Sequence, residues 1–255
     1  MKIATWNINS IRIRLESLRE FLIEENPDIL LLQELKCETE KFPLEELADL
    51  PYNCYVHGQK SYNGVAILSK FPADEFITDF PQNPCQEQAR FIEISIQTPI
   101  GYLQIVSLYA PNGSVVGSDK FEAKLQFYDQ FINYLTTKKS PIIIGGDFNI
   151  APFDIDVYSP TDLSGTTCFT YSEQQRFRTI LNSGFEDLYR LFHPDKQEFS
   201  WWDYRAGAFE QNKGMRIDML LSSAIIADKL QECYMVYNTR AKLKPSDHIP
   251  VVGVF

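Results

Sequence analysis

Residues 141–150 read PIIIGGDFNI, an apolar run that ends in two glycines and is followed by alternating polar side chains. A short run of β-branched residues bounded by glycine is typical of a buried strand. Asp147 and Asn149 follow that strand, where a rigid strand end can aim side chains at one edge of a sheet. Residues 2–9 read KIATWNIN and repeat this plan faintly, with Asn7 and Asn9 in the corresponding places. The faint similarity of the two stretches indicates that they belong to related halves of a sandwich.

Apolar runs of the same kind recur along the whole chain. They predict strands at Lys2–Trp6, Asp28–Gln33, Gly64–Ser69, Phe91–Gln97, Tyr102–Tyr109, Pro141–Gly145, Ile217–Leu221 and Val251–Phe255. Apolar residues at helical spacing predict helices at Arg14–Glu25, Lys120–Leu135 and Ser172–Leu181, the last opened by a Ser172-x-x-Gln175 capping box. Strands outnumber helices and the two are interspersed. We therefore expect an α/β sandwich, with two packed sheets covered by helices on the outside.

Composition limits the class of protein. The 255 residues contain no linker-like stretch, so we expect one domain over residues 1–255. The net charge of −10 and the pI near 4.9 argue against a protein that coats DNA through many Lys and Arg contacts to phosphate. A bound divalent cation weakens this objection, because it neutralises site carboxylates and a substrate phosphate together.

The cysteines and the apolar segments indicate the compartment. The five cysteines are scattered and form no Cys-x-x-Cys pair, which predicts reduced, buried thiols and excludes a zinc site or a disulfide framework. No segment resembles a signal peptide or a membrane span. We expect a cytoplasmic, nucleoid-associated protein that makes no contact with a membrane, and a monomer is the default.

Polar side chains follow most of the predicted strands. Taken singly, each is more often a turn former or a cap than a functional group. Taken together, they supply the oxygen ligands that Mg²⁺ prefers and the acid and base groups that phosphodiester hydrolysis requires. Besides the four residues named above, they are Glu34, Tyr109, Asp218, Asp247 and His248.

The residue types suggest roles without assigning them uniquely. Glu34 at a strand end suits a Mg²⁺ ligand, and Asp147 beside Asn149 can accept a proton from water. Asp218 lies inside an apolar run, so its charge needs a partner. Paired with Asp218, His248 could donate to the charge that develops on phosphorus or act as a base.

With these motifs the chain resembles the exonuclease III family of abasic-site endonucleases, within the endonuclease/exonuclease/phosphatase superfamily. The resemblance covers nearly the whole chain, from WNIN at 6–9 to SDHIP at 246–250. It implies a four-layer α/β sandwich, with two mixed sheets flanked by helices and the active site at one end of both sheets. The motifs in between follow the family order: LQELK at 32–36, YN at 52–53, HGQK at 57–60, NGVAILS at 63–69, YAPNG at 109–113, GGDFNI at 145–150, FSWWDY at 199–204 and GMRID at 214–218.

The resemblance also implies an activity and a cofactor. The family hydrolyses duplex DNA on the 5′ side of an abasic site and leaves a 3′-hydroxyl and a 5′-deoxyribose phosphate. The same site trims 3′ phosphates, and many members degrade duplex ends from 3′ to 5′. Carried over, Glu34 becomes the ligand of Mg²⁺, for which Mn²⁺ can substitute, with Asn7 and Asp247 near the metal.

The catalytic roles carry over onto five positions. The resemblance makes Asp147 and Asn149 the pair that orients the attacking water. It places Asp218 where it holds His248 against the scissile phosphate, which Tyr109 also approaches. Whether Asp147 or His248 is the base stays open.

The resemblance further implies a surface that binds the lesion and the DNA around it. Trp201, with Met215 and Leu221 as less certain neighbours, matches an apolar pocket that fits a bare sugar and clashes with a base. Trp202 is expected in the core. The further DNA contacts expected are Asn9, Lys36, Gln59, Lys60, Tyr62, Asn63 and Arg216.

Two departures and two alternatives accompany this interpretation. Residues 112–120 hold no Arg where some family members insert one into the duplex, and Met215 replaces a bulkier aromatic, so the balance between incision and end resection stays open.

Another superfamily hydrolase, acting on a phosphoinositide, a sphingolipid or a messenger-RNA tail, would share the catalytic groups but not the Trp201 segment or the loop 59–66. A catalytically silent DNA binder would lack a metal ligand or the histidine, and here every expected group is present.

Overall fold

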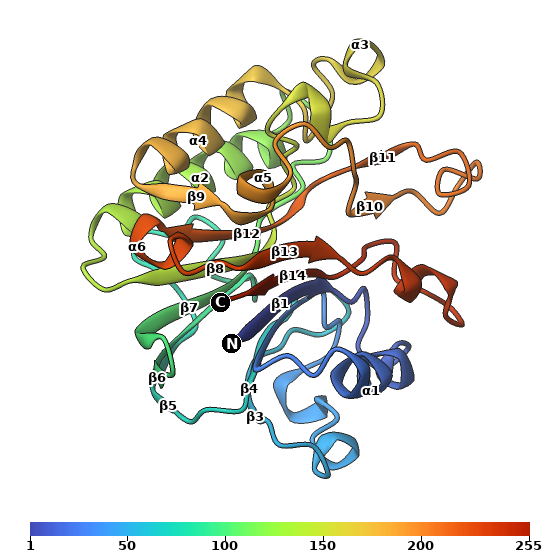
Figure 1. Ribbon diagram of the computed structural model, residues 1–255. Coiled ribbons are helices and arrows are strands. Elements are labelled where there is room, and N and C mark those ends of the chain that lie inside the picture. Colours follow the sequence, from blue (N-terminus) through green and yellow to red (C-terminus); the bar gives the residue numbers. More distant parts are fainter.

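Two six-stranded sheets face each other in the computed structural model, which describes residues 1–255 (Figure 1). The first sheet has the order β13-β14-β1-β2-β4-β3, with β1 Lys2–Asn7, β2 Ile29–Gln33, β3 Asn53–His57, β4 Val65–Ser69, β13 Glu232–Met235 and β14 Val251–Val254. The second has the order β5-β6-β7-β8-β12-β9, with β5 Ala73–Ile77, β6 Phe91–Thr98, β7 Gly101–Tyr109, β8 Ile142–Asp147, β9 Phe185–Asp187 and β12 Asp218–Ser223. Both sheets are mixed, because β1 pairs in parallel with β2, and β7 with β8.

Helices cover the outer face of each sheet and complete four layers (Figure 1). The first sheet buries Ala4, Trp6, Leu30 and Leu32 against the apolar face of α1, and the second sheet is covered by α2 and α4. The predicted sandwich is therefore confirmed. The helices are α1 Leu15–Glu24, α2 Asp119–Thr136, α3 Pro160–Leu163, α4 Tyr171–Asn182, α5 Leu188–Phe192 and α6 Ala224–Ala227, with 3-10 turns at η1 Thr39–Lys41, η2 Glu45–Leu47, η3 Asp154–Asp156 and η4 Tyr237–Ala241.

The two-residue period of the strands places polar side chains at the ends of apolar rows. Ile3 of β1 and Ile143 of β8 both belong to the core between the sheets. Side chains two and four positions further along a strand point to the same face. Asn7 and Asp147 therefore end these inner rows, and they meet across the gap between the sheets, where the Asn7 amide donates to Asp147 at 2.9 Å.

The sheets lie close together just beneath these side chains. A Cβ atom added to Gly145 would lie 2.4 Å from Leu31 Cδ1 and 2.8 Å from Leu220 Cδ2, so a side chain at this position would push the sheets apart. Gln33 of the first sheet also donates to Ser107 of the second at 3.0 Å. Together the glycine and this hydrogen bond fix the spacing of the sheets at the end that carries the polar cluster.

The predicted strands and helices are present, but the residues that cap the last predicted helix differ from the prediction. Each predicted strand coincides with an observed one, and the long helices begin and end within about one residue of their predicted limits. The capping box of α4 is formed by Thr170 and Glu173, not by Ser172 and Gln175. Glu173 is buried beside the helix terminus, where its side chain accepts from the backbone of Thr170. Gln175 is exposed to water and takes no part in the cap. The short strands β3, β5, β9, β13, β10 (Trp201–Trp202) and β11 (Gly214–Met215) were not predicted, because none has a long apolar run.

The state of the cysteines and the character of the helices were also predicted from composition. All five cysteines are free thiols, and each is buried except Cys54, which is half-buried. None of the helices has both the length and the apolar character that crossing a bilayer requires.

Candidate active site

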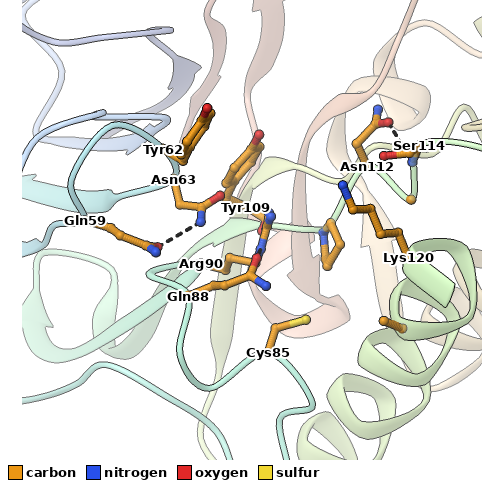
Figure 2. A pocket seen from close by; sticks show the side chains of 13 residues that line it. Gln59, Tyr62, Asn63, Cys85, Gln88, Arg90, Tyr109, Asn112, Ser114 and Lys120 are labelled. Atoms are coloured by element: carbon orange, nitrogen blue, oxygen red, sulfur yellow. Dashed lines mark hydrogen bonds between the residues drawn. The ribbon is translucent and has the colours of Figure 1, made fainter.

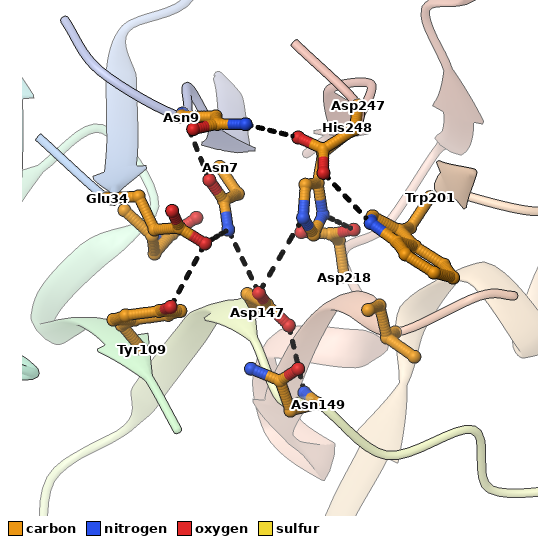
Figure 3. Close-up of polar contacts among 12 residues, drawn as sticks. Asn7, Asn9, Glu34, Tyr109, Asp147, Asn149, Trp201, Asp218, Asp247 and His248 are labelled. Atoms are coloured by element: carbon orange, nitrogen blue, oxygen red, sulfur yellow. Dashed lines mark hydrogen bonds and ion pairs between the residues drawn. The ribbon is translucent and has the colours of Figure 1, made fainter. Parts of the chain in front are cut away.

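The polar ends of the inner strand faces converge in one cluster (Figure 3). Tyr109, Asp147 and Asp218 end or begin three adjacent strands and are aligned in register across the second sheet. Glu34 follows β2 in the first sheet, and His248 precedes β14. Ligand atoms of Glu34, Asp147 and His248 all lie within 4.8 Å of one another. The structure thus brings together all of the residues that were predicted to be catalytic, together with the predicted metal ligand Glu34.

Asn7 lies at the centre of the cluster and joins its two sides. Its Nδ2 donates to Glu34 Oε1 and to Asp147 Oδ2, both at 2.9 Å. Its Oδ1 accepts from the backbone N–H of Asn9 at 3.1 Å, which fixes the orientation of the amide. Asn7 therefore presents donors to two carboxylates that would otherwise repel each other. Its predicted place beside a metal fits this position, but its oxygen is engaged by Asn9.

Glu34 is held as a carboxylate. Oε1 also accepts from the Tyr109 hydroxyl at 3.0 Å, and Oε2 lies 2.8 Å from the ammonium of Lys36. Burial raises the pKa of Glu34, but the charges of Lys36 and His248 and the hydrogen bonds from Asn7 outweigh burial, so the pKa falls below its ordinary value. Glu34 is consequently ionised at neutral pH, as a ligand of a divalent cation must be.

Several residues of the site adopt the left-handed backbone conformation. The φ angles are +46° for Asn9, +53° for Glu34, +53° for Lys36 and +49° for Asn149. This region is uncommon for residues other than glycine and clusters at functional sites. All four residues lie within three positions of the ends of β1, β2 and β8, where this conformation turns the chain.

His248 is paired with Asp218 and faces Asp147. Nδ1 of His248 lies 2.8 Å from Asp218 Oδ2, and Nε2 lies 3.9 Å from Asp147 Oδ2. Burial lowers the pKa of His248, but the carboxylates of Asp218, Asp247 and Asp147 outweigh burial and raise the pKa to about 10. The hydroxyl of Ser200 donates to the same Asp218 oxygen at 2.7 Å. The predicted Asp218–His248 pair is therefore confirmed as a contact, and it is supported by a buried serine that was not predicted.

The carboxylate of Asp147 is buried and lies near the charged side chains of His248, Asp218 and Glu34. Burial raises the pKa of Asp147 to about 7; His248 opposes this increase, and the negative charges of Asp218 and Glu34 add to it. Its Oδ1 accepts from the backbone N–H of Asn149 at 2.9 Å. A carboxylate whose pKa lies near neutrality is suited to take up a proton from water.

Asn149 is locked by its neighbours. Its Nδ2 donates to the carbonyl of Ala110 at 2.9 Å, and its Oδ1 accepts from Asn112 Nδ2 at 3.0 Å. Asn112 was not predicted as a site residue, although its place three residues after Tyr109 in the YAPNG motif is a usable signal. The two asparagines connect the loops that follow β7 and β8.

Tyr109 has a buried hydroxyl and an arginine over its ring. The pKa of Tyr109 is raised well above 10 by burial and by the carboxylates of Glu34 and Asp147. The Arg90 guanidinium carbon lies 4.7 Å from the ring centroid, and Arg90 also donates to the Tyr109 carbonyl at 3.2 Å. Tyr109 therefore keeps its proton at neutral pH and acts as a hydrogen-bond donor.

Asp247 lies beside the cluster rather than within it. Its Oδ1 accepts from Asn9 Nδ2 at 2.7 Å and its Oδ2 from Trp201 Nε1 at 3.1 Å. Burial raises the pKa of Asp247, but the charge of His248 and these two hydrogen bonds outweigh burial, so the pKa is lowered. Asp247 is outside the group of three whose ligand atoms converge, so its place near a metal stays a prediction.

Apolar side chains border the cluster on the side of Trp201. Trp201 pairs with Met215 in a short two-stranded ribbon, and both pack on a small core that contains Ile217. Trp202 is wholly buried, as predicted. The expectation for Leu221 is wrong, because Leu221 points to the opposite face of β12 and is buried among the side chains beneath α2 and α4. Ile217, which precedes Asp218, occupies the place that was given to Leu221.

A pocket of about 560 Å³ lies next to Tyr109 and holds part of the predicted DNA-contacting loop (Figure 2). Gln59 and Asn63 line it and are joined by a hydrogen bond of 2.8 Å. Tyr62 also lines it and is 72% exposed, and Lys60 is exposed. Arg90, Asn112 and Lys120 contribute further polar lining. Lys60 and Tyr62 therefore face solvent at the edge of the cluster, whereas Asn63 is buried and Gln59 is half-buried.

The prediction that Arg216 contacts DNA is wrong. Its side chain is wholly buried and forms hydrogen-bonded ion pairs with Asp156 at 2.6 Å and Asp187 at 2.7 Å. Arg190 pairs with Asp156 as well. Two arginines and two aspartates thus neutralise each other beneath the site, and no donor of Arg216 is directed at solvent. The sequence does not show this, because Asp156 lies 60 positions from Arg216.

Known proteins resemble this chain over its whole length. The model of the endonuclease/exonuclease/phosphatase family matches residues 4–248. Exodeoxyribonuclease III of Haemophilus influenzae is 35% identical, and the match covers 100% of both chains. The 3′ phosphatase NExo from Neisseria, solved with a product DNA hairpin, has a TM-score of 0.95 at 35% identity. An AP endonuclease from Archaeoglobus fulgidus has a TM-score of 0.95 at 36% identity. Each structural match covers 100% of this chain and 99% of the other.

Proposed function

The chain belongs to the endonuclease/exonuclease/phosphatase family, in its exonuclease III group, and on this premise we propose that it is a Mg²⁺-dependent DNA-repair nuclease. It hydrolyses the duplex backbone 5′ to an abasic site and leaves a 3′-hydroxyl and a 5′-deoxyribose phosphate, as base excision repair requires. It also removes 3′ phosphates and resects 3′ ends. The relatives named for these activities support the proposal: an exodeoxyribonuclease, a 3′ phosphatase and an AP endonuclease. The enzyme acts as a monomer with one domain over residues 1–255, in the cytoplasm beside the nucleoid.

The observation that carries this proposal is the convergence of Glu34, Asp147 and His248 beside the apolar wall of Trp201 and Met215. The three polar groups could serve any hydrolase of the superfamily. The wall is what distinguishes a DNA-lesion nuclease from an enzyme that cleaves a phosphoinositide, a sphingolipid or a messenger-RNA tail. The indole Nε1 bonds to Asp247, which is adjacent to His248 in the chain, so the wall and the polar cluster are held together.

The donor set suits a hard divalent cation. Glu34 and Asp147 offer carboxylate oxygens within 4.8 Å of each other, and Asn7 holds both side chains in place. Mg²⁺ binds through one or two carboxylates and retains water and phosphate oxygens in its remaining positions. Bound there, Mg²⁺ would neutralise charge on the phosphate and make phosphorus easier to attack, and Mn²⁺ would do the same.

The chain's own residues then divide the proton chemistry. Asp147 takes the proton of the attacking water, because its pKa lies near neutrality, whereas the raised pKa of His248 keeps the imidazole protonated. Asn149 is held by Asn112 and by backbone bonds, so its amide sets the direction of that water. In this proposal Asp147, and not His248, is the general base.

The protonated groups face the phosphate from two sides. His248, oriented by Asp218, donates from Nε2 to the negative charge that grows on the non-bridging oxygens. Tyr109 retains its hydroxyl proton and donates from the opposite side of the cluster. The imidazole is fixed by Asp218 before substrate arrives, whereas the Tyr109 hydroxyl has to turn from Glu34 Oε1 towards the phosphate.

Lesion recognition uses the missing base. Extruding a nucleotide from the duplex costs a few kcal/mol, and this cost is lowest for a damaged or unpaired one. Trp201, Met215 and Ile217 offer an apolar surface beside the catalytic cluster, against which a bare deoxyribose packs. The exposed loop with Lys60 and Tyr62, together with Lys36 and Asn9, follows the backbone on either side.

The test compares the wild type with Asp147→Asn on a duplex that holds one abasic-site analogue. We expect the variant to bind the duplex with nearly wild-type affinity and to cut it about 100- to 10,000-fold more slowly, the range for loss of a general base. His248→Ala should behave in the same way. Binding is measured by fluorescence anisotropy and cutting by single-turnover kinetics. Near-normal turnover by either variant would contradict the proposed mechanism.

A further inference from the structure

The chain buries one lysine completely, and this lysine lies directly behind the catalytic cluster. Lys124 occupies the apolar face of α2, between Phe121 and Tyr128. An ammonium group in such a place needs an acceptor for each of its three hydrogens. The structure provides three: the carboxylate of Glu173, the carbonyl of Asn112 at 3.1 Å and the carbonyl of Asn149 at 2.6 Å.

Both carbonyls belong to residues of the active site. Asn112 lies in the loop after β7, which carries Tyr109, and Asn149 lies in the loop after β8, which carries Asp147. The side chains of Asn112 and Asn149 are joined by a hydrogen bond of 3.0 Å. The ammonium of Lys124 therefore completes a ring that connects the two loops through side chains on one side and backbone on the other.

The ring leaves no polar group of Asn149 without a partner. Its N–H donates to Asp147, its Nδ2 donates to the Ala110 carbonyl, its Oδ1 accepts from Asn112 and its carbonyl accepts from Lys124. Its φ angle of +49° is a conformation that the chain must hold against strain. Two bonds in this set are charge-assisted, the one to the Asp147 carboxylate and the one from the Lys124 ammonium, and such bonds are about twice as strong as neutral ones.

Glu173 anchors the lysine to a second helix. Its carboxylate also accepts from the backbone N–H of Cys168 at 3.0 Å, and from the N–H and hydroxyl of Thr170 at 2.9 Å and 2.7 Å. Gly113 fits around the lysine stem, since a Cβ at that glycine would lie 3.0 Å from Lys124 Cδ. The ammonium thus has one packed position, which is set by α2, α4 and the loop after β7.

We propose that Lys124 and Glu173 are a positioning pair that holds the backbone of Asn112 and Asn149, and through it the side chains that orient the attacking water. The inference rests on the proposed role of Asp147 and Asn149. Apolar side chains of the same volume would join α2 to α4 without the cost of desolvating two charges. What the ion pair adds is a directed bond to each of two loop carbonyls.

The experiment uses the full-length enzyme and three variants: Lys124→Met, Glu173→Gln and the double variant Lys124→Met/Glu173→Gln. The double variant removes both charges, so it leaves no buried charge unpaired, and the amide oxygen of the substituted side chain can still accept from the N–H groups of Cys168 and Thr170. Lys138→Met is the matched control, because Lys138 follows the end of α2 by two residues and its ammonium pairs with another buried glutamate, Glu93, at 2.7 Å. Each protein is assayed for kcat and KM on the abasic duplex and for thermal unfolding.

We expect the double variant to unfold near the wild-type temperature and to lose about 10- to 100-fold in kcat, the cost of displacing a reacting group by up to about 1 Å. KM should stay unchanged, because the buried pair touches no DNA, and Lys138→Met should retain the wild-type kcat. The side-chain amide resonance of Asn149, identified by its loss in Asn149→Asp, should shift in the double variant in EDTA and not in the control. This readout does not depend on turnover.

Two results would overturn the inference. One is a folded variant that lacks the Lys124 ammonium but has a kcat within twofold of the wild-type value and an unshifted Asn149 resonance. The other is failure of all three variants to fold, since the pair would then be a requirement of folding. Failure of the wild type to cut the abasic duplex would contradict the proposed function instead, and the Asn149 resonance would still decide whether the pair positions this residue.

Discussion

Replacing Arg216 by methionine separates a structural role from a DNA-binding one. The change leaves the buried carboxylate of Asp156 with Arg190 alone and that of Asp187 with no arginine partner. Removing one partner of a buried ion pair costs about 3–5 kcal/mol. For a chain of this size, each kcal/mol lowers the melting temperature by about 2–4 °C, so the variant should melt about 6–20 °C below the wild type.

Circular dichroism on heating measures this loss, and binding of the duplex at several salt concentrations measures the other role. We expect the slope of log K against log salt to be unchanged, because the buried guanidinium neutralises no phosphate. Adding Asp187→Asn to Arg216→Met should restore part of the stability, since one unpaired charge is removed. Wild-type stability combined with a shallower salt slope would refute the reasoning and return Arg216 to the DNA surface.

Four further outcomes are expected from the same geometry. Asp218→Asn removes the largest of the three carboxylate charges that raise the pKa of His248 to about 10, so this pKa should fall towards its ordinary value near 6.5. The variant's kcat/KM relative to wild type should therefore decrease between pH 6 and pH 8, by at most about 25-fold for complete loss of the shift, and a pH-independent ratio would contradict the account. The same raised pKa means that protonated His248 stabilises the fold fully below about pH 6.5 and that this contribution is lost as the pH rises towards 10. Urea unfolding of Asp218→Asn should therefore show a smaller dependence on pH than the wild type, because Asp247 and Asp147 alone remain to raise the pKa. Trp201→Ala should lower kcat/KM for abasic incision about 10-fold more than for resection of a recessed 3′ end, and equal losses on both duplexes would remove the pocket from the account. Lys60→Met should make the salt slope shallower by about 0.9, the value for one phosphate contact, and an unchanged slope would place Lys60 away from the DNA.

Much of the fold and of the cluster was accessible from the sequence because it depends on local patterns. Inner-face alternation in β1 and β8 predicts where Asn7 and Asp147 point once the strands are recognised. Asp218 within an apolar run signals a need for a partner, and His248 provides it. These inferences require only strand period, strand ends and charge.

The remaining contacts depend on distant partners that no local pattern reveals. Arg216 looks like any basic residue until Asp156 and Asp187 are seen around it. Ser200 is unremarkable in sequence, yet its hydroxyl accepts from two backbone N–H groups and donates to Asp218. Lys124 did leave a signal, since it interrupts the apolar face of the predicted helix Lys120–Leu135. The acceptors that explain it lie in two loops and a second helix.

The most direct test of the central claim is one gel with two labelled duplexes, one holding a single abasic-site analogue and one intact with a recessed 3′ end, each incubated with Mg²⁺ or with EDTA. The account predicts a single Mg²⁺-dependent cut on the 5′ side of the lesion, with a 3′-hydroxyl that a polymerase extends. Ladders on both duplexes without that cut would leave a 3′ exonuclease and contradict the lesion pocket at Trp201. Cleavage of neither duplex, in an enzyme that hydrolyses lipid or RNA phosphodiesters, would contradict the assignment to DNA repair.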